Sequence, residues 1–152
     1  MTEYHLRRFW NLDLYRKCAH VDDFSTLDNL IDAMSDILSE RSGAGIAAPQ
    51  VGDNRQVIMI DLHLEYLVMV NPRVIESKGH AFSVEGCMSI PLFLFPKIRS
   101  EEILVEYNDA KGYRTKKRFS GFYSFAVQHE IDHLHGKLIF QYLKHYRKEY
   151  EK

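Results

Sequence analysis

The chain has 152 residues, of which 45% are hydrophobic and 27% charged, which is ordinary for one domain with a real core. Its net charge of −1 argues against direct binding of nucleic acid or of an anionic membrane, because either needs a basic surface. No apolar run approaches the ~18 residues of a membrane span, and the first residues do not resemble a secretory signal. Two cysteines without a disulfide-type pattern favour a reducing compartment. We therefore expect a cytoplasmic protein, or one in an organelle lumen or, if phage-encoded, in the host cytoplasm.

The first clear element is an amphipathic helix near residues 26–40. Ser25 followed by Asp28 indicates a capped start, and Ser42–Gly43 indicates the end. The stretch Gly43–Gly52 that follows is rich in small residues, which let a backbone pass close to another chain or to a ligand, although a plain turn has the same composition. The apolar positions of the helix recur at helical spacing: Leu27, Leu30, Ile31, Met34, Ile37 and Leu38.

Strands are predicted in the middle of the chain. Residues 56–61 and 67–71 are rich in Val, Ile and Met, and Pro72 should end or interrupt the second strand, which residues 73–77 then continue. Residues 103–107 and 113–119 alternate moderately well and are separated by a turn sequence, so they predict a β-hairpin.

A second helix should begin near Ser120 or Gly121 and stop at Gly136. It reads His129-Glu130-Ile131-Asp132-His133, and residues four apart on a helix lie on one face, so both histidines can reach one metal ion. Glu130 lies beside them, where it could act as a base toward water; a buried helix with two satisfied histidines is the alternative. The helix is apolar enough to be buried, which predicts an α+β fold of antiparallel β-sheets packed around this central helix. We expect a single domain over residues 1–152, with 144–152 a frayed polar tail.

Two histidines do not complete a catalytic metal site, which usually takes three protein ligands. The only glutamates downstream of the motif are Glu149 and Glu151, and both lie in the polar tail. Cys87, between Gly86 and Met88, is the better candidate, since a thiolate is a strong ligand for zinc and ferrous iron. A buried thiol without a metal is the alternative for this residue. Asp132 could orient a ligand histidine, but we interpret it as a surface salt-bridge or capping residue, and His135 as solvent-facing.

Three stretches together resemble the peptide deformylase family: Gly43 to Gln50, Glu85 to Ser89, and Gln128 to His133. The resemblance covers roughly residues 14 to 143. It implies that Cys87, His129 and His133 hold one divalent metal, generally Fe²⁺ in the cell, with Zn²⁺, Ni²⁺ or Co²⁺ possible in a purified sample. It also implies that Glu130 moves the proton, and that Gln50 and the backbone N–H of Met88 stabilise the oxyanion. The reaction would remove formate from the N-terminal formyl-methionine of a nascent peptide.

The resemblance further places the peptide in an extended form between Ala44–Gly45 and Gly86, where it would add a strand by backbone hydrogen bonds. Its methionine would enter an apolar pocket with walls Ala44, Met88, Phe122, Phe125 and Ala126. Core packing is the alternative for the last three.

The chain departs from the family at Leu92-Phe93-Leu94-Phe95, where bacterial members commonly have polar or charged residues. This apolar run predicts a hydrophobic entrance to the site or a docking patch; the alternative is a loop that folds onto the body as core. The short tail leaves contact with the ribosome open, and we expect a monomer. Two other functions compete: a zinc peptidase that shares the helix motif, and a catalytically silent binding module with a deformylase-like fold.

Overall fold

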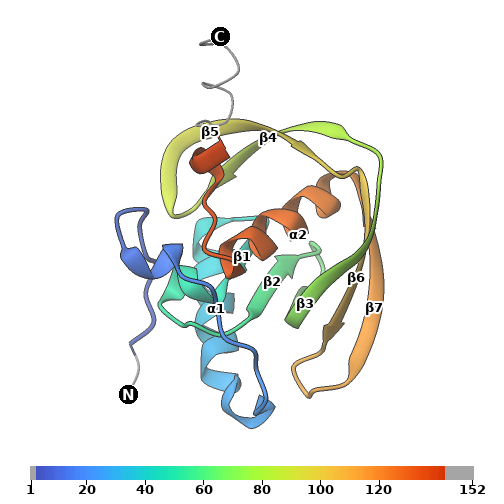
Figure 1. Cartoon of the computed structure of the whole chain (residues 1–152). Helices are drawn as coiled ribbons and strands as arrows, with labels where there is room; N and C mark the ends of the chain where they lie inside the picture. The colour runs from blue at the N-terminus through green and yellow to red at the C-terminus, as the bar shows by residue number, and fades with distance from the viewer. Residues whose placement is uncertain (1–2, 143–152) are drawn as a thin grey trace.

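The structure is a computed structural model that describes residues 3–142 (Figure 1). The predicted tail 144–152, with Glu149 and Glu151, lies outside these residues. None of the helices described is long and apolar enough to cross a membrane. The elements, in chain order, are η1 (Leu12–Tyr15), η2 (Phe24–Thr26), α1 (Asp28–Arg41), β1 (Gly45–Ala47), η3 (Ala48–Val51), β2 (Val57–Asp61), β3 (Tyr66–Lys78), β4 (Ala81–Cys87), β5 (Ile90–Arg99), β6 (Glu102–Asn108), β7 (Arg114–Ser120), α2 (Gly121–Leu134) and η4 (Ile139–Tyr142), where η marks a 3₁₀-helix.

Two antiparallel sheets and two α-helices make up an α+β fold. The larger sheet has the strand order β1-β2-β3-β6-β7, and β4 and β5 form a separate two-stranded sheet. The predicted hairpin is present, with Glu102 opposite Ser120 at one end and Asn108 opposite Arg114 at the other. Strand β3 runs through Pro72, but its register to β6 shifts between Val70 and Arg73. Proline lacks the N–H that a regular ladder needs, so the strand is interrupted there without ending.

Strand β2 explains how the two helices are placed. Its side chains alternate, and both sets are buried: Ile58 and Ile60 belong to the core that α2 covers, whereas Val57 and Met59 belong to the core under α1. Helices α1 and α2 therefore cover opposite faces of this part of the sheet. The α1 stripe predicted from the sequence supplies Leu30, Met34 and Leu38 to its core, all almost fully buried. From α2 the corresponding residues are Val127, Ile131 and Leu134.

The two ends of α1 differ in how well the sequence predicted them. The helix stops at Ser42, which adopts the left-handed conformation with φ of 52°. The predicted cap by Ser25 and Asp28 is wrong. The N-cap residue is Leu27, without a side-chain bond, and the Ser25 hydroxyl instead donates to Asp23 at 2.6 Å, within the preceding 3₁₀ turn.

The β4–β5 hairpin and strand β1 were not predicted. β1 lies in the small-residue stretch, for which the sequence left a plain turn and a close backbone approach open; it is at the edge of the larger sheet and pairs only with β2 among the strands described. The β4–β5 hairpin arches over α2, and β5 contacts that helix (Figure 1). Helix α2 therefore lies between the larger sheet on one side and the hairpin on the other, and the three elements meet at one cavity.

Candidate active site

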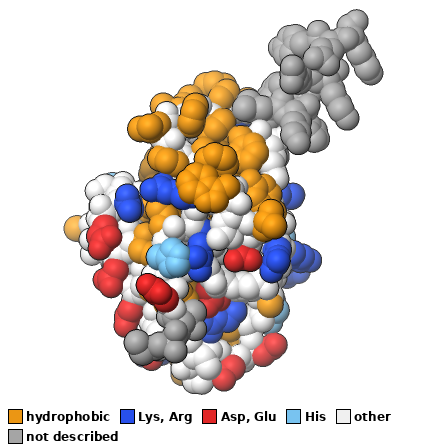
Figure 2. Space-filling view, turned by 90° about the vertical axis from the view of Figure 1, so that its left-hand side faces the viewer, with side chains coloured by type: hydrophobic (Ala, Val, Ile, Leu, Met, Phe, Trp, Pro, Cys, Tyr) orange, Lys and Arg blue, Asp and Glu red, His pale blue; other side chains and the backbone are white. Residues whose placement is uncertain are grey.

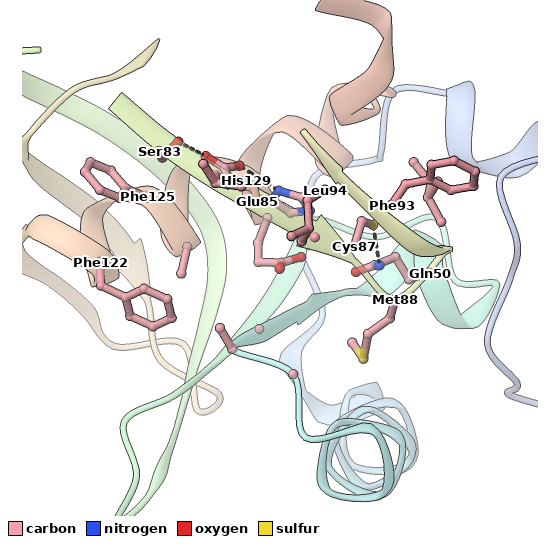
Figure 3. Close-up of a pocket in the computed structure, with 18 of the residues that line it drawn as sticks. Gln50, Ser83, Glu85, Cys87, Met88, Phe93, Leu94, Phe122, Phe125 and His129 are labelled. Atoms are coloured by element: carbon pink, nitrogen blue, oxygen red, sulfur yellow. Dashed lines mark hydrogen bonds and ion pairs between the residues drawn. The ribbon is translucent and has the colours of Figure 1, made fainter. Parts of the chain in front are cut away.

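Three potential metal ligands converge beside α2. Cys87 is the last residue of β4, and His129 and His133 are one turn apart on α2. One donor atom from each residue lies within 4.8 Å of the others, and the Cys87 Sγ is 3.4 Å from the His133 Nε2. Both histidines are buried, and Figure 3 shows Cys87 and His129 facing the same space. The helix spacing accounts for the two imidazoles, and the hairpin accounts for the sulfur.

The chemistry of this group suits a metal ion. Burial lowers the pKa of His133 to about 3, so its ring is neutral, which is the form that binds metal. Burial also opposes charge on His129, but its bonds to Cys87 and Glu85 outweigh that effect and raise its pKa to about 10. Cys87 and Glu85 thus favour a positive charge next to His129, and in the absence of a metal ion a proton on the ring supplies it. A thiolate with two imidazoles is a donor set that zinc and ferrous iron accept.

A buried carboxylate fixes the orientation of His129. Glu85, two residues before Cys87 on the same side of β4, has its Oε1 3.0 Å from the His129 Nδ1. This contact leaves the Nε2 as the ring atom that could bind a metal ion together with Cys87 and His133. Glu85 in turn accepts two hydrogen bonds from Arg99, at 2.6 and 2.8 Å. Burial alone would raise the pKa of Glu85, but the bonds from Arg99 and His129 hold it well below its usual range.

Arg99 connects this carboxylate to helix α2. Its Nη1 donates to Asp132 at 2.7 Å, and the same carboxylate accepts a bond from Lys97 at 2.9 Å. Asp132 therefore makes a salt bridge, but the bridge is largely buried and joins β5 to α2, so the surface position expected from the sequence is wrong. Glu85 and Arg99 were missed from the sequence. The alternation of Ser83, Glu85 and Cys87 along one strand is the signal that could have found Glu85.

Glu130 lies beside the metal group with one oxygen free of hydrogen bonds. Its side chain is buried, and the Oε2 has no partner among the residues described. Burial raises its pKa to about 7. The neighbouring Gly45 makes this position possible, because a Cβ added there would lie only 2.9 Å from the Glu130 Cγ.

Gln50 and Met88 flank the same group. Buried Gln50 accepts a bond from the Ala47 N–H at 2.9 Å and donates to the Ser89 hydroxyl at 3.2 Å, and its Nε2 is 3.6 Å from the Cys87 Sγ. The Met88 carbonyl accepts a bond from Arg8 at 2.8 Å. These bonds fix both residues next to the sulfur.

The site opens into a cavity of about 790 Å³. Phe122 and Phe125 extend from α2 on one side of it, and Phe93 lies beyond Cys87 on the other (Figure 3). Every residue that the resemblance assigned to substrate lines this cavity: Ala44, Gly45, Gly86, Met88, Phe122, Phe125 and Ala126.

An α+β fold in which a Cys-His-His donor group and a buried carboxylate face an open apolar cavity is an arrangement typical of metal-dependent hydrolases. Comparisons with known proteins give the family. The model of the polypeptide deformylase family matches residues 5–149. A peptide deformylase of Alkalilimnicola ehrlichii is 38% identical over 135 residues, which cover 86% of this chain and 75% of that protein.

Solved structures agree with the sequence comparison. The peptide deformylase of Thermotoga maritima has a TM-score of 0.88 and 29% identity and covers 93% of this chain and 97% of its own. A probable peptide deformylase from Synechococcus phage S-SSM7 has a TM-score of 0.87 and 31% identity and covers 91% and 99%. The chain belongs to the peptide deformylase family, as the sequence resemblance implied. It is a hydrolase that removes the formyl group from the N-terminal formyl-methionine of nascent peptides.

Proposed function

We propose that Cys87, His129 and His133 hold one divalent metal ion and that Glu130 is the base of formamide hydrolysis. The observation that carries this proposal is the convergence of three donor atoms within 4.8 Å beside a buried carboxylate with an unbonded oxygen. The ion would act as a Lewis acid that polarises the formyl carbonyl and activates water. Fe²⁺ is our assignment for the cell, while the same donor set also accepts Zn²⁺, Ni²⁺ or Co²⁺.

Glu130 would accept the proton of the attacking water and deliver it to the leaving amine. A base works best when its pKa lies near the working pH, and burial brings the pKa of Glu130 to about 7. Glu130 lines the cavity and its Oε2 has no hydrogen-bond partner among the described residues, so the carboxylate is available as the acceptor.

Gln50 and the backbone N–H of Met88 would stabilise the oxyanion that forms from the formyl carbonyl. The Gln50 carboxamide is held by Ala47 and Ser89, so its Nε2 stays near the Cys87 sulfur without reorganisation. A fixed donor of this kind typically contributes ~3 kcal/mol to lowering the barrier.

The peptide would lie extended between β1 and β4. β1 has no strand on its outer edge among those described, so backbone bonds from Ala44 and Gly45 on one side and Gly86 on the other would recognise any sequence. The methionine side chain would enter the apolar part of the cavity, with the walls Ala44, Met88, Phe122, Phe125 and Ala126.

The remaining assignments concern the whole chain. We expect a single catalytic domain over residues 1–152 that works as a monomer in the cytoplasm. Contact with the ribosome stays a prediction.

A formate-release assay tests these roles. The wild type, Glu130→Gln and the control Glu40→Gln, which changes an exposed glutamate of α1, would be prepared without oxygen and given formyl-Met-Ala-Ser. The wild type and the control should release formate at equal rates, and Glu130→Gln should keep its metal while losing at least a hundredfold in kcat. Full turnover by Glu130→Gln would reject the assigned base. Cleavage of internal peptide bonds would favour the zinc peptidase, and no release by the wild type would favour the silent module.

A further inference from the structure

The β4–β5 hairpin has its polar and apolar faces reversed. Ser83 and Glu85 point inward to the metal group, whereas the alternating Phe82 and Val84 are 66% and 57% exposed. A two-stranded sheet on a protein surface normally turns its polar side chains to water. The inner face is polar because it orients His129, but nothing in the fold requires the outer face to be apolar.

Strand β5 adds to this exposed apolar surface through a bulge. Glu85 pairs with Phe95 and Cys87 with Ile90, so two residue steps on β4 correspond to five on β5. The extra residues protrude, and Leu92 and Leu94 are 101% and 71% exposed. The expectation that this run folds onto the body as core is therefore wrong for Leu92, Phe93 and Leu94 and holds only for Phe95, which packs into a small core cluster.

Leu92 also adopts the left-handed conformation, with φ of 70°. This conformation is unfavourable for a leucine, and full exposure of the side chain gains nothing in return. Unfavourable conformations of this kind cluster at functional sites. We call Phe82, Val84, Leu92, Phe93 and Leu94 the apolar shelf.

The shelf is continuous with the catalytic cavity. All five of its residues line the same cavity as Cys87, His129 and Glu130. Hydrophobic side chains gather over the upper part of the molecule in Figure 2, at the height of β4 and β5 in Figure 1. A Cβ added at Gly86 would lie 3.4 Å from the Leu94 Cδ2, so Leu94 is next to the backbone that would pair with substrate.

We propose that the apolar shelf binds apolar side chains downstream of the formyl-methionine, so that this enzyme favours nascent peptides with hydrophobic residues at positions 2 to 4. The inference rests on the proposed function, because it needs the formyl group at the metal group and the chain beside Gly86. An extended peptide leaving that point spans ~3.3 Å per residue and presents alternate side chains to the shelf. The shelf contains no charged residue, which disfavours an acidic or basic occupant.

The test compares two peptides of equal length, formyl-Met-Leu-Phe-Leu and formyl-Met-Ser-Asn-Ser. The wild type should have a KM about tenfold lower for the apolar peptide, and Phe93→Ser/Leu94→Ser should bring this ratio close to one. The control Leu64→Ser removes a fully exposed leucine of the β2–β3 turn that does not line the cavity, and it should leave both KM values unchanged.

Equal KM values for the two peptides in the wild type would overturn the shelf proposal, and so would an unchanged ratio in the double variant. Absence of formate release from both peptides would instead contradict the proposed function. Two further assays compare the wild type with the double variant: binding to phosphatidylcholine–phosphatidylglycerol vesicles, and dimerisation in the ultracentrifuge. If the double variant loses vesicle binding or dimerisation while the KM ratio persists, the surface belongs to a membrane contact or to a second copy, and the peptide subsite is rejected.

Discussion

A single methyl group added at Gly45 should displace the proposed base and slow the reaction. In Gly45→Ala the new Cβ would lie 2.9 Å from the Glu130 Cγ, 3.0 Å from its Oε1 and 2.9 Å from the Ile60 Cδ1. Ordinary contact begins at 3.4 Å, so these groups must separate by about half an ångström. Ile60 is fully buried in the core under α2, which leaves Glu130 as the group that moves toward the cavity.

The size of the effect follows from that displacement. A shift of ~1 Å in a catalytic group costs on the order of 10²-fold in rate, so a shift of about half an ångström should lower kcat by about tenfold. KM should change little, because alanine keeps the backbone N–H and C=O of β1. Overpacking should cost about 1–3 kcal/mol of stability.

Steady-state formate release from formyl-Met-Ala-Ser, with metal content measured on the same samples, checks this reasoning. Gly86→Ala is the comparison, because its nearest neighbour would be Leu94 at an ordinary 3.4 Å, and it should alter kcat less than Gly45→Ala does. A kcat for Gly45→Ala equal to that of the wild type would refute the claim that the position of Glu130 limits catalysis.

Three further predictions concern the buried charges. Glu85→Gln should weaken metal affinity by roughly 10- to 100-fold in competition with a chelator, because His129 loses its charged partner; unchanged affinity would contradict this role. Arg99→Met should lower the free energy of unfolding by about 3–5 kcal/mol, measured in urea, since buried Glu85 loses its guanidinium partner and Asp132 is left with Lys97; a loss below 1 kcal/mol would show that these carboxylates find other partners. As the pH rises from 4.5 to 7, the metal-free wild type should lose up to about 3 kcal/mol of stability relative to Glu130→Gln. Burial raises the pKa of Glu130 to about 7, so in this pH range the folded chain holds a proton that the unfolded chain releases. A pH-independent difference in melting temperature between the two proteins would argue against that shift.

The sequence predicted those parts of the fold in which burial and periodicity agree. The stripe that ends at Leu38 identified α1, the turn at Gly112 identified the β6–β7 hairpin, and the His129–His133 spacing identified the face of α2 that carries two of the three potential metal ligands. The family resemblance then contributed Gln50 and Met88, which no local pattern singles out.

What the sequence did not predict depends on contacts between distant segments. The β4–β5 hairpin was missed because its buried face carries Ser83 and Glu85 and its exposed face is apolar, the reverse of the usual signal. The role of Arg99 requires β5 to lie against α2, which no short-range pattern encodes. Ser25 is not the cap because Phe24–Thr26 form a separate 3₁₀ turn capped by Asp23, and α1 begins only after Leu27.

Substitution of Co²⁺ into the protein tests the central claim most directly, because sulfur bound to cobalt gives a charge-transfer absorption that nitrogen and oxygen ligands do not. The chain offers a matched pair of cysteines: Cys87 at the donor group, and Cys18, which is buried away from it with its pKa raised by burial to about 12. The wild type and Cys18→Ala should bind about one equivalent of cobalt and show the band, and Cys87→Ser should lack it. A band that persists in Cys87→Ser, or that disappears in Cys18→Ala, would contradict a metal site built on Cys87, His129 and His133.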